Sequence, residues 1–418
     1  MNYRRVVVTG IGLITPLGHT IDEFWKNLES GFSSADNITR FDAEKFKTQF
    51  ACEVKNFNPK DYLDRKELRK SDLFSQYAMV SADNAIKDSG LDLEKIDKER
   101  AGVIWASGIG GITALQEEIS NFAKGDGTPR FSPFFIPKMI IDLAAGNISI
   151  KYGFHGVNFA TVSACASSSN AIGSAYEYIR YGRVDVMVAG GSEASISPIA
   201  VGGFNSMKAM SVRNDDPKTA SRPFDRDRDG FVIGEGGVGF ILEEYEHAKK
   251  RGATIYAEIA GSGYSADGYH ITAPHPEGLG ASLVMKNVLK DAEINPEKID
   301  YINVHGTATP RGDISETIAI KDVFADNAYK LNISSTKSMH GHLLGAAGAI
   351  EGLVCILAMR NNIVPPTINQ FNRDPEIDSK LNLTKNDAQQ REINYALSNT
   401  FGFGGHNVSL LYKKLEAK

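Results

Sequence analysis

The stretch Phe159-Ala-Thr-Val-Ser-Ala-Cys165-Ala-Ser-Ser-Ser-Asn-Ala-Ile-Gly-Ser-Ala-Tyr-Glu-Tyr-Ile179 joins a short strand-like run to a helix. The residues before Cys165 are small or β-branched, whereas apolar residues after it recur at helical spacing. We therefore expect Cys165 at a strand-to-helix junction. There the first N–H groups of the helix lack carbonyl partners and the helix dipole is positive, and both favour a thiolate. This stretch alone fits a nucleophile and a small buried core residue equally well.

The composition is typical of a globular chain with a large core. The 418 residues are 42% hydrophobic, and the formal net charge is −5. This balance provides no overall basic field, so we expect no nucleic-acid partner, and an anionic partner would need a local basic patch. We find neither a signal peptide nor an apolar stretch of about 18 residues, which predicts a cytoplasmic protein that does not enter a membrane.

The three cysteines lie far apart, at Cys52, Cys165 and Cys355. Their odd number and wide spacing argue against a disulfide framework and for a reducing compartment. Cys355 lies in an apolar helical run and is assigned to the core, as is Cys52. Cys165 is therefore the candidate nucleophile.

Segments rich in valine and isoleucine alternate with amphipathic segments along the chain. This alternation predicts an α/β fold whose parallel strands are buried on both faces. We expect strands at 5–10, 101–106, 184–190, 237–243, 255–261, 301–305 and 331–334, and helices at 21–30, 70–89, 112–123, 167–181, 280–292, 313–324 and 343–361.

The two halves of the sequence contain similar segments. Residues 102–111 resemble residues 301–309, and each segment precedes a helix. The strand leading into Cys165 likewise resembles the strand that leads to His342. If the halves are duplicated βαβ units, the corresponding loops meet at one end of the sheets and bring Cys165, His305 and His342 together.

The histidines admit two interpretations. His305, His340 and His342 could supply three imidazoles, the number of protein ligands that a catalytic zinc ion uses, which would favour a zinc hydrolase. Alternatively, His305 and His342 could each donate a ring N–H to an oxygen that gains charge, without a metal. The loop 402–405 could add a backbone N–H to such an oxyanion hole. These residues alone leave both alternatives open.

Two further motifs carry weaker signals. Residues 225–236 resemble a calcium-binding loop, but the twelfth position is Gly236 instead of glutamate, so we expect a structural loop held by Asp–Arg contacts. Gly10-Ile-Gly12 and Gly108-Ile-Gly110 lack the third glycine of a dinucleotide fingerprint. Neither motif therefore predicts a cofactor.

Eight motifs spread over the whole chain carry a family resemblance. They are Arg5-Val-Val-Val-Thr-Gly-Ile-Gly12, Ser107-Gly-Ile-Gly-Gly111, Ser163-Ala-Cys-Ala-Ser167, the segment 223–236, His305-Gly-Thr-Ala-Thr-Pro310, Ser335-Thr-Lys-Ser-Met339, Gly341-His-Leu-Leu-Gly-Ala-Ala-Gly348 and Asn399-Thr-Phe-Gly-Phe-Gly-Gly405. In this order they make the chain resemble the β-ketoacyl-acyl carrier protein synthases, the condensing enzymes of fatty-acid elongation, and most of all the type II synthases of dissociated bacterial systems.

The resemblance implies the thiolase fold. In this fold two similar βαβαβαββ halves form a five-layered α-β-α-β-α core, and the protein is usually a homodimer. We place the halves at residues 1–253, with cap insertions, and at residues 254–418.

The resemblance also implies an acyltransferase activity. Cys165 would accept an acyl group from the phosphopantetheine of acyl carrier protein. His305 and His342, accompanied by Lys337, would stabilise the enolate formed when malonyl-acyl carrier protein loses carbon dioxide. This carbanion would attack the acyl-Cys165 thioester, with the oxyanion held by the backbone N–H groups of Cys165 and Phe403. The product is 3-oxoacyl-acyl carrier protein, and no cofactor or metal is required.

Other residues are assigned by the same resemblance. Thr272, Thr307 and Thr309 would bind substrate, the last two through the pantetheine, while Ile109 would line the acyl tunnel and Phe135 would reach toward the tunnel of the partner subunit. Asp313, Glu316 and Glu351 would support the site around Lys337. Lys66, Arg69, Lys70, Arg130 and Lys208 would meet the acidic carrier protein, although an ordinary solvated helix start also explains residues 66–70.

Two departures from the family pattern and two rival functions accompany this hypothesis. Ala308 replaces a common serine. His340 replaces a common threonine beside His342, where it could change the protonation of its neighbour or attract a metal.

A free-standing polyketide or polyene ketosynthase would use the same chemistry. A catalytically silent partner subunit of a polyketide system would lack the nucleophile, so Cys165 argues against it.

Overall fold

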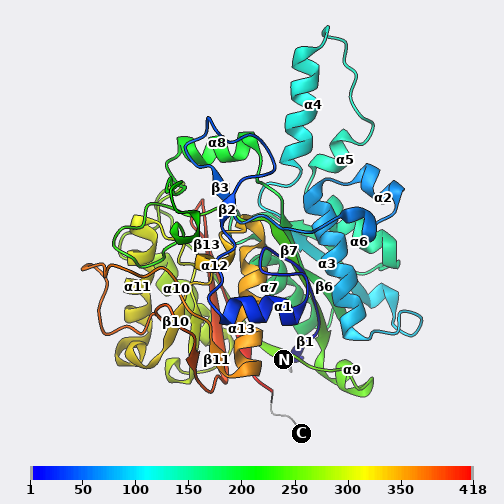
Figure 1. Ribbon diagram of the computed structural model, residues 1–418. Coiled ribbons are helices and arrows are strands. Elements are labelled where there is room, and N and C mark those ends of the chain that lie inside the picture. Colours follow the sequence, from blue (N-terminus) through cyan, green and yellow to red (C-terminus); the bar gives the residue numbers. More distant parts are fainter. Residues whose placement is uncertain (1–2, 416–418) are drawn as a thin grey trace.

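The computed structural model describes residues 3–415, which are built around one ten-stranded mixed sheet (Figure 1). The strand order across this sheet is β10-β9-β13-β14-β8-β1-β7-β6-β4-β5. The strands are β1 (Val6–Ile14), β4 (Ala101–Ala106), β5 (Asn158–Thr161), β6 (Val186–Glu193), β7 (Gly236–Glu244), β8 (Ala257–Ala266), β9 (Tyr301–Asn303), β10 (Asn332–Ser334), β13 (Tyr395–Gly402) and β14 (His406–Lys413). Two small sheets pair β2 (Asp36–Asn37) with β3 (Phe50–Ala51) and β11 (Ile363–Val364) with β12 (Gln389–Gln390).

The two halves of the large sheet repeat one strand order. Outward from the join, β1, β7, β6, β4 and β5 match β8, β14, β13, β9 and β10. The predicted duplication is therefore confirmed, because β4 and β9 occupy equivalent places, as do β5 and β10. The boundary between residues 253 and 254 falls between α9 (Tyr245–Lys250) and β8, and it stays a prediction.

The expected parallel sheet is only partly correct. In each half the three outer strands run parallel, whereas β1 and β8 run antiparallel to their neighbours β7 and β14. The turn 403–405 between β13 and β14 is short, and a connection of this length can join only antiparallel strands. The sequence analysis did not identify this hairpin.

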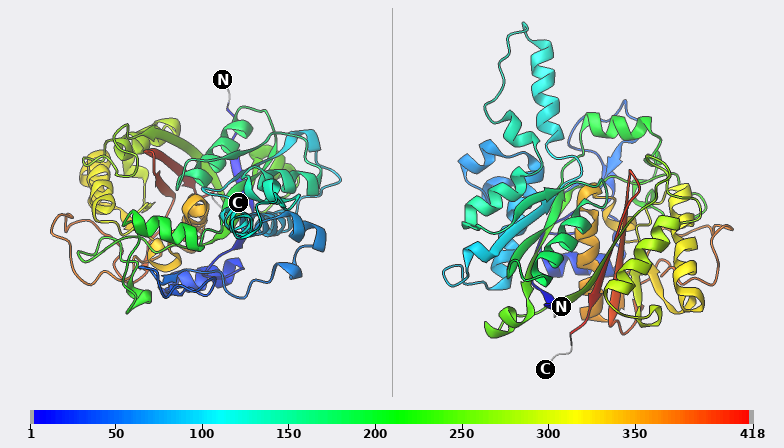
Figure 2. Two further views of the ribbon diagram at one scale, coloured as in Figure 1. Left: turned by 90° about the horizontal axis from the view of Figure 1, so that it is seen from above. Right: turned by 180° about the vertical axis from the view of Figure 1, so that it is seen from behind.

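Helices complete five layers, which confirms the expected thiolase fold (Figure 2). Between the two halves of the sheet lie α7 (Ser167–Arg180) and α13 (Ala347–Asn361). The outer faces are covered by α3 (Leu73–Ser89) and α6 (Leu143–Tyr152) on one half and by α10 (Leu279–Asp291) and α11 (Pro310–Phe324) on the other. The remaining helices are α1 (Ile21–Glu29), α2 (Arg65–Lys70), α4 (Ile112–Lys124), α5 (Phe135–Met139), α8 (Pro198–Ser206), α9 and α12 (Lys337–His340), with 3₁₀ helices at Pro59–Asp61, Lys98–Arg100, Pro217–Thr219, Pro296–Lys298, Ala325–Lys330 and Leu344–Ala346.

The stretch Leu344–Asn361 corrects one expectation from the sequence. Among residues 3–415 it is the one helical stretch long and apolar enough to cross a membrane. Nearly all of it is buried inside the protein, because α13 packs between the two halves of the sheet. A central helix is apolar on every face for this reason. Its composition is therefore that of a core helix.

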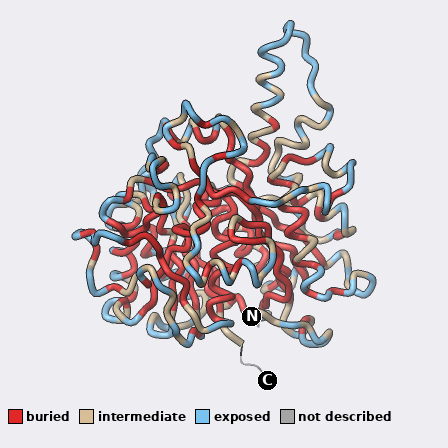
Figure 3. The backbone as a smooth tube through the Cα atoms, in the orientation of Figure 1, coloured by how far each residue is buried: buried red, intermediate tan, exposed pale blue. Residues whose placement is uncertain are grey.

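The cap insertions lie outside the layered core. Burial is highest along the central stack, whereas α4 and the segment that follows it project into solvent (Figure 3). The helix predicted at 70–89 is interrupted, since α2 ends at Lys70 and α3 begins at Leu73. Asp72 lies between them in an extended conformation, and its carboxylate accepts the N–H of Phe74 as an N-cap.

Glycines allow the outer helices to approach the central strands. A Cβ at Gly12 of β1 would lie 2.0 Å from the carbonyl oxygen of Ser81 in α3. A Cβ at Gly263, in the equivalent strand β8, would lie 2.5 Å from the carbonyl oxygen of Val284 in α10. Gly12 is therefore required for the packing of α3 on β1. This packing role explains the Gly10-Ile-Gly12 motif without a bound dinucleotide.

Replacing Gly12 with alanine should destabilise the protein through this contact. We expect the free energy of unfolding to fall by about 1–3 kcal/mol, measured by denaturant titration, because the strand and the helix must separate. Gly146→Ala in α6 is the matched control, since a Cβ there meets nothing within 4 Å. The control should be neutral or slightly stabilising. Equal losses in the two variants would contradict this account of the packing.

Candidate active site

Cys165 lies on a strained turn between β5 and α7, as the sequence predicts. Ala164 has φ of 50°, a left-handed conformation that is unfavourable for alanine. The side chain of Ser167 stabilises the turn, because its Oγ accepts the N–H of Ser163 at 2.9 Å and donates to the carbonyl of Ala164 at 2.6 Å. The turn directs the Cys165 side chain into a cavity, where 8% of the residue is exposed.

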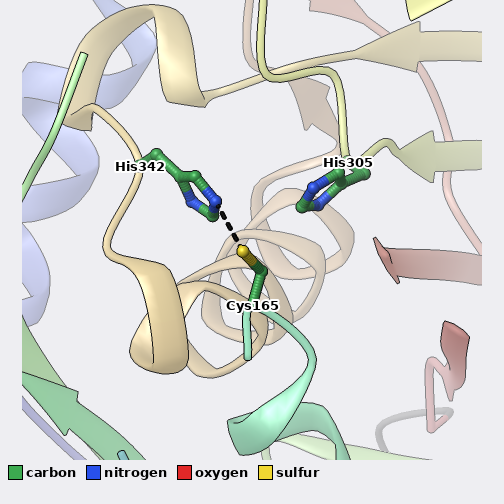
Figure 4. Close-up of side chains that lie close together, drawn as sticks. All are labelled: Cys165, His305 and His342. Carbon is green, nitrogen blue, oxygen red and sulfur yellow. Dashed lines mark hydrogen bonds between the residues drawn. The ribbon is translucent and has the colours of Figure 1, made fainter. Parts of the chain in front are cut away.

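Two histidines from the other half of the chain meet this sulfur (Figure 4). The Nε2 atom of His342 lies 3.0 Å from the Cys165 Sγ atom. The ring of His305 packs edge-on against that of His342, with centroids 5.4 Å apart. Backbone contacts hold both residues, since the His305 N–H donates to Glu316 and the His342 N–H donates to the carbonyl of Val232. The duplicated halves thus bring the three side chains together as expected.

A buried cation lies behind the histidines. Lys337 is 1% exposed and forms an ion pair with Glu351 of α13. Burial, reinforced by the charge of Lys337, holds the pKa of His305 and of His342 well below the usual value. Burial likewise raises the pKa of Glu351 to about 7, opposed by Lys337. The imidazoles of His305 and His342 are therefore neutral near pH 7.

The expected thiolate is not the resting form of Cys165. Burial raises the pKa of this thiol to about 12, and Lys337 and a backbone hydrogen bond from Phe403 only partly oppose the shift. The sequence placed the sulfur near a helix N-terminus but gave no measure of how completely it is removed from water. A neutral thiol and a neutral imidazole therefore share the hydrogen bond between Cys165 Sγ and His342 Nε2.

A cavity of about 600 Å³ extends from this cluster. Its polar lining includes Thr307 and Thr309, whose hydroxyl groups lie 3.1 Å apart. Its apolar lining includes Phe204, Phe231 and Leu344. Of the residues assigned from the sequence, the cavity is lined by Ile109, Cys165, Lys208, Thr272, His305, Thr307, Thr309, Glu316, His342 and Phe403.

The assigned acidic residues support the site in different ways. Glu351 contacts Lys337 directly, whereas Glu316 accepts the backbone N–H groups of His305 and Gly306, each at 2.9 Å. Asp313 instead accepts the N–H of Phe224, a residue that is not part of the Cys165–His305–His342 cluster. Burial raises the pKa of Glu316 to about 7 and that of Asp313 to about 6.

The remaining assigned residues lie outside the cavity lining. Phe135 begins α5 and stacks on Phe131 at 5.7 Å. Lys66, Arg69 and Lys70 are exposed on α2, and Arg130 is exposed before α5. The helices α2, α5 and α8, which Lys208 follows, all lie toward the upper part of Figure 1.

His340 does not join the cluster of Cys165, His305 and His342. Its ring is fully buried, and its nitrogens bond to the carbonyl of Gly341 at 2.7 Å and the hydroxyl of Thr336 at 3.0 Å. The histidine trio considered as zinc ligands is therefore wrong. The donor atoms that do lie within 4.8 Å of one another belong to Cys165, His305 and His342.

Glu193 is a buried carboxylate that the sequence analysis missed. It ends β6 and accepts hydrogen bonds from the loop that carries Ile109. The only signal in the sequence is one acidic residue at the end of an apolar strand, a pattern that also occurs at ordinary strand ends.

Comparisons with known proteins agree with this geometry. Residues 3–248 match the model of the β-ketoacyl synthase N-terminal domain, and residues 256–371 match that of the C-terminal domain. The fold and the cysteine–histidine site thus define a condensing enzyme of the acyltransferase type. The chain belongs to the β-ketoacyl synthase family.

Similar proteins cover the whole chain. A curated relative from Coxiella burnetii, named 3-oxoacyl-[acyl-carrier-protein] synthase 2, is 49% identical over 99% of this chain and 100% of its own length. A relative of the same name from Staphylococcus aureus is 47% identical over 99% of each chain. A β-ketoacyl synthase from Burkholderia phymatum has a TM-score of 0.92 at 37% identity, and a type II polyketide ketosynthase solved with its acyl-carrier protein has a TM-score of 0.91 at 36% identity. Each structural match covers 99% of this chain and 100% of the other chain.

The raised pKa of Cys165 predicts a steep pH dependence of alkylation. Because a pKa of about 12 leaves the group protonated across the neutral range, the rate with iodoacetamide should rise about tenfold per pH unit from pH 7 to 9. Peptide mapping by mass spectrometry would separate Cys165 from the buried Cys52 and Cys355. A plateau near pH 7 would instead indicate a resting thiolate.

Proposed function

We propose that this protein elongates acyl chains on acyl carrier protein, with Cys165 as the nucleophile. An acyl group on Cys165 condenses with malonyl-acyl carrier protein to give 3-oxoacyl-acyl carrier protein and carbon dioxide. The contact between Cys165 Sγ and His342 Nε2, at the wall of a cavity that His305 also lines, is the observation that carries this proposal. The full-length relatives named for the same synthase activity support it.

The first step transfers the acyl group. The Cys165 sulfur attacks the acyl thioester as its proton passes to His342 Nε2, which lies 3.0 Å away. A new S–C bond forms, the pantetheine C–S bond breaks, and the leaving thiolate takes the proton from His342. The neutral state of His342 allows it to act as this base.

The second step removes carbon dioxide from the malonyl group. The electron pair of the broken C–C bond moves onto the thioester oxygen, and the ring N–H groups of His305 and His342 stabilise the enolate. His342 must then donate from Nε2, where it accepted before. Among residues 3–415 its Nδ1 atom has no hydrogen-bond partner, so neither tautomer is fixed. The positive charge of Lys337 also favours the enolate.

The third step forms the new carbon–carbon bond. The enolate carbon attacks the acyl-Cys165 carbonyl, and the backbone N–H groups of Cys165 and Phe403 receive the oxyanion. Collapse of the intermediate breaks the C–S bond to Cys165, and the expelled thiolate takes up one proton from water, the proton that the overall reaction consumes. The loss of carbon dioxide drives the reaction, so the proposed cycle uses neither a cofactor nor a metal.

Fatty-acid elongation is favoured over polyketide synthesis. The curated relatives at 46–49% identity are named 3-oxoacyl-[acyl-carrier-protein] synthase 2. The structural matches described as polyketide ketosynthases or as partners of a chain length factor are 26–36% identical. The higher full-length identity therefore supports the fatty-acid substrate.

The substrate enters on its carrier protein. Thr272, Thr307 and Thr309 would bind substrate, the last two through the pantetheine arm, and Ile109 would contact the acyl chain, since all four line the cavity. The carrier protein would dock on the exposed cations Lys66, Arg69, Lys70, Arg130 and Lys208.

A homodimer would cover two exposed features. The edge strand β5 pairs with β4 on one side only, and it leads directly to the nucleophile. The projecting segment around α4 and α5 exposes apolar side chains that include Ile119, Phe122 and Ile136. Phe135 on this segment would reach toward the cavity of the partner subunit. We place the dimer in the cytoplasm, where the three cysteines of each chain would stay reduced.

Single substitutions separate the steps. Cys165→Ala should abolish condensation and acyl-enzyme formation, measured by intact-protein mass. His305→Ala should leave the acylation of Cys165 largely unchanged but lower carbon dioxide release from malonyl-acyl carrier protein by about 10²–10³-fold, because one oxyanion donor is lost. Normal elongation by the first variant, or normal decarboxylation by the second, would reject the roles assigned to these residues.

Charge reversal on α2 tests carrier docking. Lys66→Glu with Arg69→Glu should raise the KM for acyl-acyl carrier protein by roughly tenfold or more and leave the reaction with a small pantetheine thioester unchanged. Lys249→Glu with Lys250→Glu is the matched control, because these exposed lysines lie on α9 at the other end of the molecule (Figure 1). Equal effects on the large and the small substrate would remove the docking role.

A further inference from the structure

The buried carboxylate of Glu193 has no part in the chemistry proposed above. It is 0% exposed, and among residues 3–415 it forms no ion pair. Hydrogen-bond donors surround it instead. They are the hydroxyls of Ser107 and Ser195, both at 3.0 Å, and the backbone N–H groups of Gly108 at 2.7 Å, Ile109 at 3.3 Å and Gly345 at 3.0 Å.

Four of the five donors come from two loops in different halves of the chain, and the fifth, Ser195, follows Glu193 by two residues. The loop after β4 carries Ile109, which lines the cavity, and the loop before α13 carries His342. The backbones of the loops touch, since a Cβ at Gly345 would lie 2.0 Å from the nitrogen of Gly108. One oxygen of Glu193, Oε2, accepts the N–H groups of both glycines.

The donor set fits a carboxylate and no other side chain of this size. An ionised carboxylate has only acceptor sites, about four lone pairs on two oxygens, whereas an amide would direct two N–H groups at these donors. Burial of an ion without a counter-ion is costly unless hydrogen bonds compensate it. Burial raises the pKa of Glu193, and the surrounding donors oppose this shift.

We propose that Glu193 is a positioning residue that fixes the Ile109 wall of the cavity relative to the His342 loop, and thereby sets which acyl chain lengths the enzyme condenses. The distance from the Cys165 sulfur to the Ile109 wall determines how an acyl chain passes along the cavity. The position of His342 determines the decarboxylation geometry for every chain. This inference rests on the proposed elongation function.

The test compares Glu193→Gln with Glu243→Gln. Glu243 is an equally buried carboxylate of β7, but its partners are Thr9, His247 and Arg251, none of which lines the cavity. The measurements are kcat/KM for a series of acyl-acyl carrier proteins from short to long, together with the thermal midpoint of each variant. We expect Glu193→Gln to lose roughly tenfold to a hundredfold in kcat/KM, with a loss that changes along the series. Glu243→Gln should lower the midpoint without altering the length profile.

A second arm tests whether Glu193 acts through Ile109. In an Ile109→Ala background, Glu193→Gln should no longer change the length profile, although it should still slow decarboxylation. If Glu193→Gln fails to fold, Ser107→Ala removes one donor and should shift the profile in the same direction by a smaller factor.

The measurements distinguish a failure of the positioning role of Glu193 from a failure of the proposed elongation function. Folded Glu193→Gln with an unchanged profile, or a loss equal for all chain lengths, would overturn the positioning role. Wild-type protein that elongates none of the acyl chains would instead reject the proposed function itself.

Discussion

The contact between α7 and α13 holds the two halves of the chain at the separation that the active site needs. A Cβ at Gly348 would lie 1.9 Å from the Oγ atom of Ser169, so the two helices touch at close range. The hydroxyl of Ser168 accepts the N–H of Ala349 across the same contact. Cys165 precedes one helix and His342 precedes the other. The closeness of sulfur and imidazole is thus a consequence of small residues between the helices.

Burial then determines the charge state of the site. The pKa of the Cys165 thiol is raised and the pKa of each imidazole is lowered because both kinds of group lose water. The two shifts favour the same resting state, a neutral thiol beside neutral rings. Lys337 and Glu351 lie beside each other as a buried ion pair, since either charge alone would be costly in this interior.

Part of this arrangement could be predicted from the sequence. The strand-to-helix junction at Cys165 follows from local periodicity, and the convergence with His305 and His342 follows from the similar segments in the two halves, because duplicated units place equivalent loops at one edge. The raised pKa of Cys165 could not be predicted, since desolvation depends on packing from distant segments. Most hydrogen bonds of Glu193 could not be predicted for the same reason, because four of its five donors lie about 85 or 150 residues away in the chain. His340 differs, because both partners of its ring, Thr336 and Gly341, lie within four residues of it, and only the direction in which the ring points was not evident from the sequence.

The left-handed backbone of Ala164 is worth a comparison with glycine. Glycine adopts this conformation freely, whereas alanine does so at a cost of roughly 1–2 kcal/mol. A glycine here would also widen the range of directions open to the neighbouring side chain. Alanine at this position therefore lowers the folding stability slightly, but it restricts the backbone conformations open to the turn. The backbone strain thus limits the positions that the Cys165 sulfur can occupy.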